Sequence, residues 1–282
     1  MKRNGEITMQ QRIDLVGKIG SMALIRPEDH DIDYNIFSRL GHALRPGMIW
    51  VSSGATEIGR LDYLRRHGHE LDNGIDEMKT DYAAQGQAIL MENYRRFIDP
   101  KYSVRQVLVE HQHFNDPEKR AHLQGLFFRA AAQDAIPIVN YNDPVSFTEN
   151  RKMELITLKK QHEDVVECID NDETASVIAE AVHARTLLLM TGVDGIYADP
   201  QDPSTLVREI SAKTPEALEK KVRELQKNCI GASRPGANGA KAKLEYALRS
   251  ALSGTHVIIG HAKHHLNDLL AESVPCTVIG LD

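Results

Sequence analysis

The sequence predicts an α/β protein: a three-layer α/β/α sandwich around a mostly parallel central sheet. Short apolar segments alternate with segments of helical periodicity along the whole chain. Each apolar segment ends at glycine or small polar residues, which is typical of a buried strand followed by a turn. Strands that alternate with helices favour a parallel sheet with helices on both of its faces.

The apolar segments are predicted as strands, and the amphipathic segments between them as helices. The predicted strands lie within residues 12–20, 47–55, 103–111, 136–143, 186–195, 255–260 and 276–282. The predicted helices cover residues 34–44, 82–98, 118–134, 173–184, 214–226 and 240–252. Residues 65–81 are polar and poorly periodic, so we expect a surface excursion near the rim of the site. A second polar break, residues 149–167, is expected to separate two lobes.

Composition excludes several classes of protein. The 282 residues carry a net charge of −6, which argues against a general nucleic-acid surface. The 3 cysteines (Cys168, Cys229 and Cys276) lie far apart without a CxxC pair, so we expect a reducing compartment and assign them no catalytic role. No segment is apolar enough for a signal peptide or a membrane span. The expectation is a cytoplasmic protein that binds neither nucleic acid nor membrane.

Small residues follow the first two predicted strands. Lys18 lies between Gly17 and Gly20 at a strand end, where backbone N–H groups can converge on an oxyanion. The Walker A pattern is absent, and a turn with a surface lysine is the alternative. Residues 52–55 (SSGA) allow the backbone to approach a ligand closely, although an ordinary turn would look the same. Ser53 is not in a GxSxG elbow, which argues against a hydrolase nucleophile.

Polar clusters follow the middle strands. Residues 140–143 (NYND) contain groups that could hold an amino group or orient a carboxylate, or could simply form turns and caps. Residues 170–173 (DNDE) precede a predicted helix, and we expect Asp172 to serve in part as its N-cap. The remaining carboxylates exceed what capping needs, so they could position lysines or a magnesium ion.

Two further loops are candidates for binding a nucleotide. Residues 191–195 (TGVDG) form a glycine-bracketed loop after a strongly apolar strand. Residues 236–243 (GANGAKAK) place glycines and then lysines at a predicted helix start, where N–H groups and the helix dipole favour phosphate. Plain loops with solvated lysines are the alternative for both.

The order and spacing of these segments resemble the amino-acid-kinase superfamily, most closely its glutamate 5-kinase branch. The resemblance runs from about residue 14 to the C-terminus and rests on KIGSMAL, VSSGATEIGR, AAQGQ, IPIVNYND, the DND triplet, LLLMTGVDGIYADP and AKAKLEYA. It implies the amino-acid-kinase fold, ATP with Mg²⁺ as cofactors, a small acidic substrate and a homo-oligomer. It also implies one continuous kinase domain, with an acceptor lobe at residues 1–165 and a nucleotide lobe at 166–282. Several glutamate 5-kinases carry a C-terminal RNA-binding-like domain, which we expect this chain to lack.

The resemblance also implies roles for individual residues. The catalytic residues would be Lys18, Asp172 and Lys243. The substrate-binding residues would be Gly20, Ser53, Gly54, Glu57, Asn140, Tyr141, Asp143 and Asn171. The nucleotide-binding residues would be Lys18, Thr191, Gly192, Asp194, Tyr197, Gly236, Gly239, Lys241 and Lys243.

The chemistry agrees with these roles. Phosphoryl transfer depends on positioning and electrostatic stabilisation, and two lysines need an acid between them to limit their mutual repulsion. A carboxylate acceptor is already ionised near neutral pH and needs no base, so the sequence favours formation of an acyl phosphate.

Departures from the family pattern keep other readings open. The family's asparagine-glutamate-asparagine-aspartate stretch has Tyr141 in place of the acid, and Glu57 follows the SGA motif where small residues are usual. Gly192 stands where an aspartate is common, and residues 234–241 also differ. One alternative is a kinase of a phosphate or phosphonate acceptor, as in the uridylate kinase branch. Another is a non-catalytic nucleotide-binding or storage protein, against which the retention of both lysines and Asp172 argues.

The histidines near the C-terminus raise the question of a metal site. His261 and His265 have the i, i+4 spacing of a helical zinc pair, with His264 beside them. No nearby cysteine or carboxylate pattern supports zinc, so we predict solvated histidines and no metal site.

Overall fold

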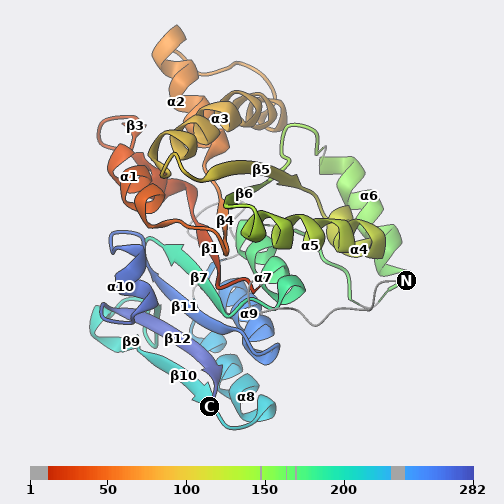
Figure 1. Ribbon diagram of the computed structural model, residues 1–282, viewed down its shortest axis with the longest axis vertical. Helices are drawn as coiled ribbons and strands as arrows, with labels where there is room; N and C mark the ends of the chain where they lie inside the picture. Colours follow the sequence, from red (N-terminus) through yellow and green to blue (C-terminus); the bar gives the residue numbers. More distant parts are fainter. Residues whose placement is uncertain (1–11, 147, 163, 169, 230–238) are drawn as a thin grey trace.

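The centre of the fold is an eight-stranded sheet with the order β10-β12-β11-β7-β1-β4-β6-β5 (Figure 1). The computed structural model describes residues 12–146, 148–162, 164–168, 170–229 and 239–282. The strands of the sheet are β1 (Leu15–Ile19), β4 (Met48–Ser52), β5 (Ser103–Val109), β6 (Ala135–Tyr141), β7 (Thr186–Thr191), β10 (Glu209–Ala212), β11 (His256–His261) and β12 (Cys276–Leu281). Neighbouring strands are parallel except β11 and β12, which confirms a mostly parallel sheet.

Helices cover both faces of the sheet, which confirms the three-layer sandwich. One face carries α1 (Tyr34–Ala43), α2 (Ala55–His67), α3 (Ile75–Phe97) and α10 (Leu266–Leu270). The other carries α5 (Pro117–Ala132), α7 (Asn171–Val182), α8 (Pro215–Lys227) and α9 (Gly239–Leu252). Successive strand residues point to opposite faces, so Leu15 and Val16 of β1 lie in two separate apolar clusters. Both clusters are fully buried, which is why the strands read as continuous apolar runs.

Short elements lie outside these layers. They are the pair β2 (Ile25–Arg26) and β3 (Asp31–Ile32), the pair β8 (Ile196–Tyr197) and β9 (Leu206–Val207), the helices α4 (Gln112–Asn115) and α6 (Thr148–Lys159), and the 3-10 turns η2 (Ser21–Leu24) and η3 (Pro203–Thr205). None of the helices in the described part of the chain is long and apolar enough to cross a membrane.

The structure corrects several predicted boundaries. Residues 65–81 are exposed, as expected, but they are largely helical: residues 65–67 end α2 and residues 75–81 begin α3. Apolar periodicity is missing there because these turns face solvent. The polar break at 149–167 contains most of α6, which has the same weak apolar pattern. The edge strand β10 was missed because it is four residues long and begins at an exposed Glu209.

Helices α2 and α3 are in backbone contact, and this contact fixes where α2 begins. A Cβ atom at Gly59 would lie 1.9 Å from the carbonyl oxygen of Tyr82, and one at Gly86 would lie 1.8 Å from that of Ala55. Only glycine permits so close an approach. Gly54, at φ +109°, makes the turn from β4 into α2. The SSGA segment is therefore held rigidly at the end of β4.

The carboxyl ends of β1, β4, β6 and β7 lie next to one another in the sheet. Ligands of open α/β sheets bind at such ends. Strands from the first part of the chain (β1, β4, β5, β6) form one side of the sheet, and strands from residue 186 onward form the other. The division of labour between an acceptor half and a nucleotide half stays a prediction.

Candidate active site

Three charged side chains from three elements meet beside the carboxyl ends of these strands. Lys18 comes from β1, Asp172 from the first turn of α7, and Lys243 from the second turn of α9. Lys18 Nζ lies 2.7 Å from Asp172 Oδ1, and Lys243 Nζ pairs with Oδ2 of the same carboxylate. The side chains are 12%, 13% and 15% exposed, respectively. The structure therefore brings together all three residues predicted as catalytic.

The electrostatics of this cluster favour an anionic ligand. Burial would raise the pKa of Asp172, but the ammonium groups of Lys18 and Lys243 outweigh it and hold that pKa well below its usual range. Asp172 is thus ionised at neutral pH and joins two cations through one carboxylate. Among these three side chains one positive charge is in excess, and in a largely water-excluded position it attracts oxyanions.

Asp170 rather than Asp172 caps α7, contrary to the sequence prediction. Its Oδ1 accepts hydrogen bonds from the backbone N–H groups of Asp172 (2.9 Å) and Glu173 (3.0 Å). The capping residue precedes the helix, and its oxygen reaches the N–H groups of the first turn. Burial and the nearby charge of Asp172 raise the pKa of Asp170. The cap leaves both oxygens of Asp172 to the lysines.

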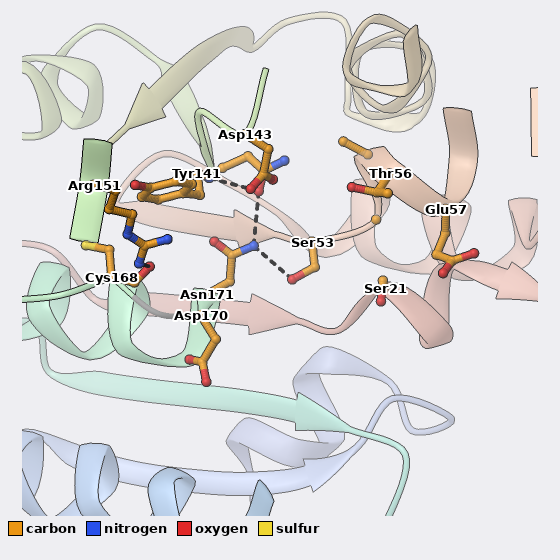
Figure 2. A pocket seen from close by; sticks show the side chains of 13 residues that line it. Ser21, Ser53, Thr56, Glu57, Tyr141, Asp143, Arg151, Cys168, Asp170 and Asn171 are labelled. Carbon is orange, nitrogen blue, oxygen red and sulfur yellow. Dashed lines mark hydrogen bonds between the residues drawn. The ribbon is translucent and has the colours of Figure 1, made fainter. Parts of the chain in front are cut away.

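A pocket of about 250 Å³ lies next to this cluster, and Figure 2 shows the side chains that line the pocket. Residues from the β4–α2 turn, the end of β6 and the start of α7 supply most of its wall. Its lining residues are Ser21, Ser53, Gly54, Ala55, Thr56, Glu57, Asn140, Tyr141, Asp143, Arg151, Cys168, Asp170 and Asn171. Asn171 and Asp170 lie next to Asp172 in the chain, so the pocket and the charge cluster share the first turn of α7.

A chain of amide hydrogen bonds sets the orientation of Asn171 in the pocket. The backbone N–H of Tyr141 can only donate, and it donates to Asn140 Oδ1 at 2.9 Å. Asn140 Oδ1 therefore also accepts from Asn171 Nδ2 at 3.0 Å, and Asn171 Nδ2 donates to Ser53 Oγ at 2.9 Å. Asn140 Nδ2 donates in turn to Gln87 Oε1 at 2.9 Å.

Asn171 Oδ1 is the open end of this network. It is buried and has no hydrogen-bond partner among the described residues. Buried acceptors are rarely left without a donor. A ligand that donates an N–H or O–H group beside Asn171 would fill this position.

The predicted acidic residues of the pocket differ in their surroundings. Asp143 is exposed within the pocket, yet desolvation by the surrounding protein raises its pKa to about 6, against the opposing charges of Arg151 and Lys79. Glu57 also lines the pocket, but it pairs with Arg60 at 3.1 Å. Gly20 lies beside the lysine rather than in the pocket wall, since a Cβ there would be 3.7 Å from Lys18 Nζ.

Apart from Lys18 in β1, the described residues predicted to bind nucleotide lie in the chain from β7 onward. Thr191 ends β7, and its Oγ1 accepts from the N–H of Val193 at 3.2 Å. Tyr197 is half-buried in β8, and a Cβ at Gly192 would meet nothing within 4 Å. Gly239 and Lys241 lie in the first turn of α9, whereas Gly236 lies outside the described residues. None of these residues lines the pocket described above.

Asp194 and the C-terminal histidines form a separate polar cluster. Asp194 Oδ1 lies 2.8 Å from Lys263 Nζ and 3.2 Å from His264 Nε2. His264 is 18% exposed, so the prediction of a solvated histidine is wrong for this residue. His261 ends β11 and His265 precedes α10, so these two residues do not form the helical i, i+4 pair that was the alternative to solvated histidines. In the described part of the chain, no three His, Cys, Asp or Glu side chains are placed to hold a metal ion.

Ser21, Arg151, Cys168 and Asp170 line the pocket without having been predicted to do so. Arg151 lies in the polar stretch that shows no periodicity, and no signal in the sequence marks it. Cys168 is buried, and burial raises the pKa of its thiol, so it stays protonated at neutral pH. Asp170 belonged to the acidic triplet, whose spacing could have identified it as the helix cap.

A family model and individual relatives of known name agree on the family of this chain. The family model described as "Amino acid kinase family" matches residues 15–261. Glutamate 5-kinase of Shouchella clausii is 30% identical over 221 residues, which are 77% of this chain and 52% of the relative. Glutamate 5-kinase of Halalkalibacterium halodurans is 26% identical over 99% of this chain and 68% of the relative. The chain thus spans between about half and two thirds of the length of these relatives.

Solved structures share the fold at low identity. Carbamate kinase from Giardia lamblia bound to AMP-PNP has a TM-score of 0.59 and 13% identity, over 97% of this chain and 100% of that one. An isopentenyl phosphate kinase substrate complex has a TM-score of 0.55 and 14% identity, over 96% and 100%. The same three-layer architecture therefore occurs in kinases named for different acceptors.

Proposed function

The chain belongs to the amino acid kinase family, and we propose on this premise that it transfers the γ-phosphoryl group of ATP to a carboxylate of a small acidic metabolite, L-glutamate or a close relative. The observation that carries the proposal is the Lys18–Asp172–Lys243 cluster beside a polar pocket. Two cations on one buried carboxylate are suited to a phosphoryl group in transit, because charge develops on its equatorial oxygens.

Each residue of the cluster has a distinct part in the proposed reaction. Lys18 and Lys243 stabilise the negative charge on the phosphoryl group as it moves from donor to acceptor. Asp172 holds the two ammonium groups at fixed positions, since without it they would repel each other. Preorganised charges need no rearrangement at the moment of reaction, which is the main source of such catalysis.

The charged groups of the site suit ATP together with Mg²⁺. The excess positive charge of the cluster and the helix start at Gly239 would hold the triphosphate, with Lys241 nearby. Mg²⁺ usually binds through substrate phosphates, water and one or two carboxylates, and it would neutralise part of the phosphate charge. We assign no further residue to the metal.

The pocket suits an acceptor that carries both an acid group and a hydrogen-bond donor. A carboxylate directed at the lysines needs no general base, because it is already ionised. Asn171 Oδ1 and Asp143 could both accept hydrogen bonds from an ammonium group. An acidic amino acid combines these features. The 30% identity with glutamate 5-kinase supports glutamate as the first candidate.

The test is an ATP-consumption assay with magnesium, a panel of small acids led by L-glutamate, and hydroxylamine to trap an acyl phosphate. Hydroxamate formed with glutamate is the expected result. ATP use without hydroxamate on a phosphate or phosphonate acceptor would instead place the chain with kinases of that kind. No turnover with any acceptor, together with nucleotide binding, would favour a non-catalytic binding or storage protein.

Acceptor binding should depend on pH through Asp143. Its pKa is raised to about 6, so the carboxyl group is ionised above that pH and protonated below it. Only the ionised form attracts an ammonium group. We therefore expect KM for the amino-acid acceptor to rise as pH falls through about 6, with little change in KM for ATP.

Asp143→Asn is the variant that tests this assignment. It should raise the acceptor KM at neutral pH and abolish the rise near pH 6. Initial rates across pH 5 to 8 would measure both effects. An unchanged pH profile in the variant would exclude Asp143 as the titrating group.

A further inference from the structure

Arg151 is held in one position at the wall of the pocket. Its Nη2 donates to the backbone oxygens of Glu167 (2.6 Å) and Cys168 (2.5 Å), in the segment that leads to α7. The centre of its guanidinium lies 4.8 Å from the centroid of the Tyr141 ring, at the end of β6. Two separate parts of the chain therefore fix this half-buried arginine, which itself lies in α6. Figure 2 shows the guanidinium beside the tyrosine ring.

The charge of Arg151 is not neutralised by a close partner. In the described part of the chain, no Asp or Glu forms an ion pair with it, and its hydrogen bonds there are donated by Nη2. The remaining N–H groups on Nε and Nη1 are donors that arginine offers in a planar fork. Among the acids of the pocket, Glu57 pairs with Arg60 and Asp170 caps α7, whereas Asp143 feels the charge of Arg151 but forms no ion pair with it. A cation in a pocket wall without a fixed counter-ion suits an anionic ligand.

The residue at position 141 helps to explain why the positive charge of Arg151 is not neutralised. The sequence resemblance places an acid at position 141, where this chain has tyrosine. A carboxylate there would lie against the guanidinium and neutralise it. The tyrosine ring instead supports the cation through its face without cancelling the charge. Tyrosine at 141 and arginine at 151 therefore form one recognition unit.

We propose that Arg151, supported by Tyr141, is a specificity-determining residue that binds a second anionic group of the acceptor, the one that is not phosphorylated. This inference rests on the proposed function and narrows its substrate class to acceptors with two acid groups. One acid group lies toward Lys18 and Lys243, and the other lies on Arg151. An ammonium group between them would face Asn171 Oδ1 and Asp143, so the complete fit is a dicarboxylic amino acid.

The test compares binding of two ligands that differ by one carboxylate. Isothermal titration calorimetry on the full chain would measure L-glutamate and 4-aminobutyrate, which lacks the carboxylate beside the amino group. Arg151→Met keeps the aliphatic stem over Tyr141 but removes the charge. We expect it to weaken glutamate binding about 10- to 100-fold, the effect of losing a hydrogen bond to a charged group, and to leave 4-aminobutyrate binding unchanged.

Two further variants sharpen the comparison. Arg151→Lys keeps the charge without the fork, so its glutamate affinity should lie between those of the wild type and Arg151→Met. Tyr141→Glu places a carboxylate against the guanidinium and should weaken glutamate binding as Arg151→Met does. Lys152→Met is the matched control, because it removes an exposed positive charge from the neighbouring position of α6. It should bind both ligands as the wild type does.

The outcomes separate this inference from the proposed reaction. Equal weakening of both ligands in Arg151→Met, or unchanged glutamate binding, would overturn the assignment. So would a wild-type protein that binds neither glutamate nor glutarate. Selective loss of glutamate binding supports the assignment even if no hydroxamate forms in the kinase assay, because calorimetry does not depend on turnover. That result would contradict the proposed kinase reaction but would support Arg151 as the binding site for a second anionic group.

Discussion

Replacing Lys243 with methionine should lower kcat at least about 100-fold, with a smaller change in the acceptor KM. Lys243 pairs with Asp172 from near the start of α9, and in the proposed reaction its ammonium group stabilises the phosphoryl group in transit. Removing a group that stabilises the transition state more than the ground state reduces turnover rather than binding. Lys18→Met, on the opposite oxygen of the same carboxylate, should have a similar effect.

The control for both variants is Lys227→Met. Lys227 is 67% exposed on α8 and pairs only with the exposed Glu224, so its loss should leave kcat unchanged. Steady-state kinetics and thermal melting of all three variants would separate lost chemistry from lost folding. Turnover like that of the wild type in both Lys18→Met and Lys243→Met would remove the proposed mechanism.

Asp172→Asn should cost both activity and stability. The carboxylate is largely buried between two ammonium groups, and asparagine would leave those charges without a counter-ion. Breaking a buried ion pair by removing one partner typically costs about 3–5 kcal/mol. Urea unfolding would measure the loss in free energy of unfolding. Adding Lys18→Met to Asp172→Asn should recover part of it, because one uncompensated charge is removed.

The stability difference between the wild type and Asp172→Asn should itself depend on pH. The pKa of Asp172 is depressed in the folded protein below its ordinary value of 3.8. A depressed carboxyl pKa stabilises the folded state fully above the unfolded pKa, and this contribution is lost as pH falls. The difference should therefore be constant near neutral pH and shrink below about pH 4. A difference that is the same at pH 3 and pH 7 would show that the charge of Asp172 does not stabilise the fold.

Much of the fold could be predicted because a strand buried on both faces has an apolar local sequence. The central strands, such as Thr186–Thr191, are apolar on both faces, and each ends at glycine or a small polar residue. Helices with an apolar face, such as Asn171–Val182, are similarly evident. Elements with little buried surface, such as α6 and the start of α3, gave no such signal, because most of their residues face solvent.

Some features of the candidate site could likewise be predicted from the sequence, and others could not. The sequence by itself determined the fold class and the family, and its resemblance to that family singled out Lys18, Asp172 and Lys243, because the order and spacing of the motifs can be followed along the chain. Only the tertiary structure decided that Asn171 leaves a buried acceptor open and that Arg151 lies on Tyr141. Those facts depend on distances between residues far apart in the chain, and local composition does not encode such distances.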